Sequence, residues 1–94
     1  MTTTHHTELE QAITFSMVLR RIRQFKGYSA RELSAKAGLA EGHVGKIEAH
    51  YKNNVTRQTM QRLLIALHPL AKSDELVLRA FIINEELKSR NTRR

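Results

Sequence analysis

The sequence predicts an all-α domain built from five helices. Apolar residues recur at intervals of three and four along most of the chain, which is the spacing of amphipathic helices. Capping residues precede several of these stretches, and Gly38 and Pro69 stand where two of them end. A chain of 94 residues suits a single domain. We expect a domain over residues 8–89, tails at 1–7 and 90–94, and helices over 8–26, 30–37, 41–48, 57–67 and 74–89.

The first helix is expected over residues 8–26. Neither glycine nor proline interrupts this stretch, and its apolar residues recur at near-helical spacing. Thr7 and Glu10 can form a capping box at its start. The preceding tail contains His5 and His6, a pair too short to be argued as a metal site.

The next two helices are expected within residues 29–48, joined by a tight turn at Gly38. Ser29 followed three residues later by Glu32 is a capping box, which predicts where the first of them starts. A sharp turn that needs a positive φ favours glycine, and Ala40 stands at the N-cap expected for the second helix. Two short helices joined in this way are typical of a helix-turn-helix.

The fourth and fifth helices follow from caps and from a proline. Thr56 is expected to cap the fourth helix, which ends before Pro69 because the residue preceding a proline avoids the α region. Ser73 is expected to cap the fifth. The inward face of the fourth helix is expected to contain Met60, Leu63, Leu64 and Leu67.

The fifth helix is apolar on nearly every side between residues 76 and 83. A terminal helix of a small domain cannot bury every side against one core, so this pattern predicts a symmetric homodimer. The alternative is a core helix covered wholly within one chain by the first helix. The residues expected at the dimer interface are Leu76, Ala80, Phe81, Ile83 and Leu87.

Positive charge is concentrated in the middle of the chain. Residues 15–72 contain eleven Lys and Arg against three acidic residues, whereas the whole chain has a net charge of +7. This excess is the footprint expected of a protein that binds a polyanion. The chain has no cysteine, no apolar run of membrane-spanning length and no secretory signal in residues 1–7, which favours a cytoplasmic location.

One set of residues stands in a single register between Phe15 and Leu67: Leu19, Arg20, Arg23, Gly27, Tyr28, Ser29, Glu32, Leu33, Ala37, Gly38, Leu39, Val44, Ile47 and Glu48. In this register the chain resembles the Cro/C1-type, lambda repressor-like (XRE) family of helix-turn-helix regulators. The resemblance implies a lambda repressor-like five-helix DNA-binding domain. Its helix-turn-helix would be formed by residues 30–37 and 41–48, and residues 74–89 would form a C-terminal dimerisation helix.

The resemblance also implies roles for individual residues. Helix 41–48 would enter the major groove, and Arg23 with Glu48 would form an ion pair that ties it to the scaffold. The implied base-reading residues are Glu41, Gly42, His43, Gly45 and Lys46. The implied phosphate contacts are Ser29, Ala30, Arg31, Lys52, Asn53, Asn54, Thr56, Arg57 and Arg20. Two positions depart from the family, which often has glutamine at Ala30 and a capping serine or threonine at Ala40.

These features together predict a sequence-specific regulator that binds double-stranded DNA. We expect a homodimeric repressor or autoregulator of prokaryotic, phage or plasmid origin that binds a pseudo-palindromic operator. The alternative is a protein-interaction module on the same fold, such as an antitoxin that binds a toxin or a polymerase-associated regulator. No catalytic residue, metal, cofactor or membrane contact is expected, because the sequence contains no phosphate-binding glycine loop and no cluster with metal-ligand spacing.

Overall fold

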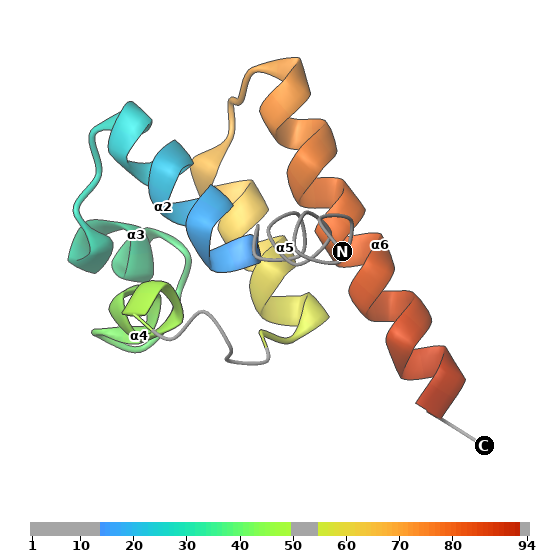
Figure 1. The fold of residues 1–94 in the computed structure, drawn as a ribbon. Coiled ribbons are helices and arrows are strands. Elements are labelled where there is room, and N and C mark those ends of the chain that lie inside the picture. Colours follow the sequence, from blue (N-terminus) through green and yellow to red (C-terminus); the bar gives the residue numbers. More distant parts are fainter. Residues whose placement is uncertain (1–13, 50–54, 93–94) are drawn as a thin grey trace, which may run out of the picture.

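Five helices make up the part of the chain that the structure describes, residues 14–49 and 55–92 of a computed structural model (Figure 1). In chain order they are α2 (Phe15–Lys26), α3 (Ala30–Lys36), α4 (His43–Ala49), α5 (Arg57–Leu67) and α6 (Lys72–Thr92). These described residues contain no strand, so their fold is all-α. Among the helices described, none has the length and apolar character that crossing a membrane requires.

The prediction of a single helix over residues 8–26 is wrong, because the chain is not helical at Thr14. The backbone there is extended (φ −116°, ψ 167°), and the Thr14 hydroxyl accepts a hydrogen bond from the Met17 N–H at 3.4 Å. This N-cap satisfies a first-turn amide that a continuous helix would bond to its preceding turn. α2 therefore begins at Phe15, and the rest of the expected helix start, within residues 1–13, lies outside the described residues.

Gly38 ends α3 in a tight turn with a φ of +71°, a conformation that side chains with a Cβ rarely adopt. The Gly38 N–H donates to the Ala35 carbonyl at 3.1 Å, and the Leu39 N–H donates to the Ser34 carbonyl at 2.8 Å. These paired bonds form a Schellman motif. Arg62 of α5 holds the turn from outside, because its Nη1 donates to the Gly38 carbonyl at 3.2 Å.

α4 begins at His43 rather than at Glu41, which corrects the expected start of this helix. Gly42 has a φ of +85°, outside the right-handed helical region, so no helical turn can pass through it. The Gly42 carbonyl accepts the Lys46 N–H at 3.0 Å and thus opens the first turn of the helix. Ala40 lies before that turn and is not the N-cap that the sequence predicts.

α6 begins at Lys72, two residues before the start expected for helix 74–89. The Ala71 carbonyl accepts the Glu75 N–H at 3.0 Å, so Ser73 lies inside the first turn and not at the N-cap. The helix also continues past its expected end, into the stretch predicted to be a tail. The expected cap at Ser73 therefore misplaced the start of this helix.

All five helices contribute to one core. Its most deeply buried side chains are Leu19, Ile22, Leu33, Ser34, Val44, Leu63, Leu67 and Leu78. α4 contacts α2 and α3, whereas α6 contacts α5 and α2, so α4 and α6 lie on opposite sides of the bundle (Figure 1, green and orange to red). An edge-to-face contact between Phe15 and Phe81, with ring centroids 5.7 Å apart, joins α2 to α6.

Candidate functional site

The outward surface of α4 and of the turn before it presents few side chains. Glu41 and Lys46 are exposed, and His43 is half-buried. Gly42 and Gly45 add no side chain, and a Cβ placed on either would meet no other atom within 4 Å. The five residues predicted to read bases therefore share one open surface, although the first two belong to the turn and not to the helix.

An exposed ion pair joins α3 to this surface. Arg31 Nη2 lies 3.1 Å from Glu41 Oε2, and the two side chains are 81% and 72% exposed. The pair thus connects a residue predicted to contact phosphate with one predicted to read a base. Exposed pairs of this kind contribute at most ~1 kcal/mol, so either residue can exchange its partner at little cost.

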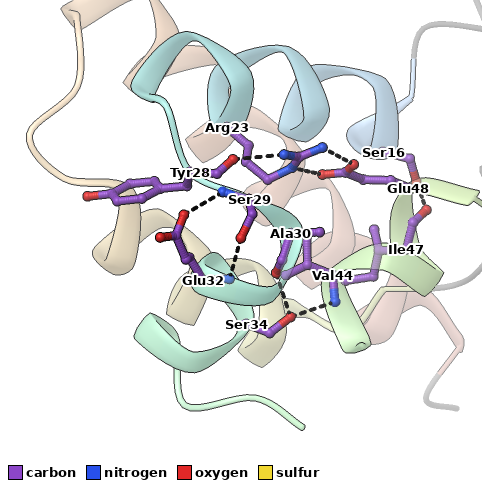
Figure 2. A network of polar contacts seen from close by, with 10 residues as sticks. All are labelled: Ser16, Arg23, Tyr28, Ser29, Ala30, Glu32, Ser34, Val44, Ile47 and Glu48. Atoms are coloured by element: carbon purple, nitrogen blue, oxygen red, sulfur yellow. Dashed lines mark hydrogen bonds and ion pairs between the residues drawn. The ribbon is translucent and has the colours of Figure 1, made fainter. Parts of the chain in front are cut away.

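A buried charged clamp holds the C-terminal end of α4 against α2 (Figure 2). Arg23 Nε donates to Glu48 Oε2 at 2.7 Å, and Arg23 Nη2 donates to Glu48 Oε1 at 2.8 Å. A third bond runs from Arg23 Nη1 to the Tyr28 carbonyl at 2.8 Å. The two charged side chains are only 12% and 9% exposed, so the expected structural pair is present with bidentate, desolvated geometry.

The clamp also shifts the pKa of Arg23. The hydrogen bond with Glu48 and the negative charge of that carboxylate raise the pKa of the Arg23 guanidinium above its ordinary value, despite burial that opposes the charge. A group whose pKa is higher in the folded than in the unfolded state stabilises the fold at pH values below its unfolded-state pKa. This stabilisation is lost as the pH rises through the folded-state pKa. Both values lie at strongly alkaline pH, so this arginine stays charged near neutrality.

Two buried serines bond to the backbone near the two ends of α4 (Figure 2). Ser34 Oγ accepts a hydrogen bond from the Val44 N–H at 3.0 Å and donates to the Ala30 carbonyl at 3.0 Å. Ser16 Oγ donates to the Ile47 carbonyl at 2.7 Å. Together with the clamp, these bonds attach α4 to both α2 and α3.

Ser34 supplies the N-cap that α4 lacks in its own sequence. Ala40 and Gly42 carry no polar side chain, while Val44 is the second residue of the helix, whose N–H an N-cap oxygen commonly accepts. The accepting hydroxyl comes from α3 instead. The bonds that Ser34 and Ser16 make to the backbone of α4 were not expected from the sequence. A serine at an inward position of a helix is nevertheless a signal, because a buried hydroxyl group needs a hydrogen-bond partner.

Two of the residues predicted to bind phosphate already have partners at helix starts. The Ser29 hydroxyl accepts the Glu32 N–H at 3.0 Å, and the Ser29 N–H donates to Glu32 Oε1 at 2.8 Å. The Thr56 hydroxyl accepts the Thr59 N–H at 3.2 Å and donates to Thr59 Oγ1 at 3.0 Å. Capping is therefore the role that these two side chains have in the structure.

The other predicted phosphate contacts differ in exposure. Arg20, Arg31 and Arg57 are exposed and can reach an anion, whereas Ala30 is half-buried and packs against the core. Three further residues lie outside the described part of the chain: Lys52, Asn53 and Asn54.

The residues predicted to form a dimer interface divide between two sides of α6. Four of them are exposed: Leu76, Ala80, Ile83 and Leu87. Phe81 is half-buried and packs edge-to-face on Phe15, so it belongs largely to the contact between α2 and α6 within one chain. Its predicted place in a dimer interface stays a prediction, because the side chain is only partly covered by this contact.

Several of the residues that the sequence predicts to contact DNA carry exposed positive charges. Arg31, Lys46 and Arg57 are exposed cations on long side chains, and the negative charge of Glu48 is neutralised by Arg23. No protein-family model, curated protein or solved structure matches this chain.

Removing one partner of the buried clamp is expected to destabilise the protein strongly. Arg23→Ala and Glu48→Ala should each lower the free energy of unfolding by ~3–5 kcal/mol, because each leaves a buried charge without its partner. The double variant should lose less free energy of unfolding than the sum of the two single losses, since no unpaired charge remains. Urea denaturation followed by circular dichroism measures all three. The matched cycle at the exposed pair Arg31 and Glu41 should give a coupling below ~1 kcal/mol, and equal coupling in both cycles would contradict the clamp.

Ser34→Ala is expected to lower the free energy of unfolding by ~1–3 kcal/mol, because the Val44 N–H loses its acceptor inside the core. Hydrogen exchange at that amide should accelerate in parallel. Ser73→Ala is the matched control, since this serine is exposed in the first turn of α6 behind the true N-cap, and its effect should stay within ~0.5 kcal/mol. A larger loss for the control than for Ser34→Ala would contradict the assigned helix starts.

Proposed function

We propose that this protein is a sequence-specific regulator of transcription that binds double-stranded DNA as a homodimeric repressor. In this proposal the fold is lambda repressor-like, α3 and α4 form a helix-turn-helix, and α4 lies in the major groove. The observation that carries the proposal is the firm attachment of α4 by its inward residues while its outward residues stay open. Such an arrangement suits a helix that must hold its position against base edges.

The residues that attach α4 to its neighbours are different from those on its outward side. Val44, Ile47 and Glu48 bond to α3 and α2 through buried partners. Lys46 is exposed and Gly45 leaves the backbone beside it uncovered. Contact with a ligand on the outer side would therefore break none of the bonds that hold the helix.

The outward groups have the chemistry that base recognition uses. A lysine such as Lys46 can donate to guanine O6 or N7, and a carboxylate such as Glu41 can accept from cytosine N4. When Glu41 turns towards a base, Arg31 becomes available to a phosphate, because their exposed pair is easily exchanged. His43 can donate to a base or a phosphate, and Arg57 adds a phosphate contact that carries no sequence information.

Two copies would bind the two halves of a two-fold operator. The exposed apolar residues of α6 support this part of the proposal, because they provide a surface that a second copy can cover. α6 lies across the bundle from α4 (Figure 1), so pairing through α6 leaves both copies of α4 uncovered. The positive charge of the helix-turn-helix region would strengthen the approach to DNA at low salt.

Lys46→Ala is expected to weaken binding to the operator tenfold or more, because a good base contact is worth ~1–3 kcal/mol of discrimination. Binding to unrelated DNA should change much less. The measurement is a titration of labelled DNA from immediately upstream of the protein's own gene, with and without unrelated competitor, over a range of salt concentrations. Lys72→Ala, which removes the same charge from the start of α6, should leave the preference for the operator unchanged.

Titration of the unmodified protein tests the proposal itself. A steep salt dependence with no preference over competitor would reduce the proposal to a basic module that contacts phosphates. No binding near physiological salt would overturn the proposal and favour a protein partner for the same fold.

Gly45→Ala is expected to affect folding and DNA binding in opposite directions. Outside its chain neighbours and the backbone of its own helix, the added methyl group meets no atom within 4 Å, so alanine should raise the free energy of unfolding by up to ~1 kcal/mol through its helix propensity. On DNA the same methyl group would stand between α4 and the groove. Affinity for the operator should fall by roughly tenfold, equivalent to ~1.4 kcal/mol of lost contact. A variant that is both more stable and an equally tight binder would show that DNA does not approach α4 closely at this residue.

A further inference from the structure

The outward side of α6 carries an apolar stripe opposite the side that faces the core. Leu78 and Ile82 face the core and are 1% and 7% exposed. The stripe consists of four exposed residues spaced by four, three and four: Leu76, Ala80, Ile83 and Leu87. This is the a/d spacing of a two-stranded coiled coil, whereas a helix that serves only one core needs a single apolar side.

We propose that a second copy of this chain covers the stripe, with the two α6 helices running antiparallel. The inference rests on the homodimer of the proposed function and deepens it by assigning the direction of the contact and the residues that pair across it. A two-fold axis midway between Ala80 and Ile83 places Ala80 of each copy against Ile83 of the other. The same axis places Leu76 of each copy against Leu87 of the other, so all four residues find apolar partners.

The surface beside Ala80 has the shape that this pairing requires. The small side chain of Ala80 lies in an open groove of about 400 Å³, whose other lining residues are Val77, Phe81 and Asn84. Ile83 of the second copy would enter this groove as a knob enters a hole. Because the axis is two-fold, the same insertion occurs twice and the helices approach closely at their midpoint.

Charges beside the stripe favour the antiparallel direction. In that direction Arg79 of each copy faces Glu86 of the other, which gives two pairs of opposite charge. In a parallel pair Arg79 would face the uncharged Asn84, and no such pairs would form. Arg79 already bonds to Glu75 in its own helix at 2.8 Å, and Glu86 also has an interaction within its own chain. The five N–H donors of a guanidinium and the two oxygens of a carboxylate allow each side chain to contact a further partner.

The stripe is short, and this sets the strength of the dimer. From Leu76 to Leu87 it extends over three turns, ~16 Å of helix, which places the contact at the small end of specific interfaces. We therefore expect the free protein to dissociate on dilution. DNA that holds both copies should stabilise the dimer, because a ligand favours the state that binds it better.

Disulfide cross-linking tests the direction, because the chain has no cysteine of its own. Leu76→Cys and Leu87→Cys variants are oxidised separately and as an equimolar mixture, and the products are identified by mass. The antiparallel pair predicts a cross-linked dimer containing one copy of each variant, with little product in either separate sample. Cross-linking of each variant with itself would indicate a parallel pair and overturn the proposal. Met17→Cys, exposed on α2, controls for random collision.

Charge reversal gives a second test that leaves the apolar stripe intact. Arg79→Glu alone should weaken dimerisation by about tenfold, because two attractive pairs become repulsive. Adding Glu86→Arg to the same chain should restore the dimer, as measured by analytical ultracentrifugation. Failure of the double variant to recover, or absence of a cross-link in every cysteine sample, would overturn the pairing.

The outcomes separate this inference from the proposed function. A protein that binds its operator as a dimer without a cross-link between residues 76 and 87 would remove the inference and leave the function standing. A cross-linked dimer with no preference for the operator would retain the α6 pairing and remove the function.

Discussion

The attachment of α4 to its neighbours controls what the outward surface of the protein can do. α4 has only seven residues and contains Gly45, and an isolated helix of that length is unstable in water. Its order comes from three buried ties, which are the Arg23–Glu48 clamp and the hydroxyl groups of Ser16 and Ser34. Each tie satisfies a polar or charged group that would otherwise be buried without a partner. Losing a tie therefore costs the desolvation of that group in addition to the bond itself.

Features that depend on neighbouring residues could be predicted from the sequence. The capping box of Ser29 and Glu32 is complete within one helical turn, and its predicted bonds are present. The bounds of α5 follow from Thr56 at its start and from Pro69 beyond its end. These features are local because both partners of each bond, or the proline that stops a helix, lie in the same short stretch of sequence.

Features that depend on distant partners could not be predicted in the same way. Ser34 bonds to an amide ten residues away on another helix, and no local pattern announces this pairing. At Thr14 the apolar spacing continues smoothly through the position where the helix is capped, so periodicity alone extended the expected helix past its N-cap. The Arg23–Glu48 pair, 25 residues apart, was expected only because the register of a known family suggested it.

The two apolar sides of α6 illustrate the same limit. The sequence predicted that one core would not cover every side of this helix, but the two sides are alike in composition. The position of Phe15 decides between them, because its ring takes Phe81 into the intramolecular contact and leaves Leu76 and Ile83 outside. Tertiary placement, rather than hydrophobicity, therefore determines which apolar residues are core and which are surface.

The ties that hold α4 have a consequence for how this chain can change over generations. Its stabilising partners reside in α2 and α3, while Glu41, His43 and Lys46 contribute little to the core. Substitutions at these outward positions are therefore nearly neutral for folding, since surface changes away from buried features cost little. A lineage can exchange them in many combinations without first acquiring compensating stability, so the scaffold is well suited to diversification of whatever its outer surface binds.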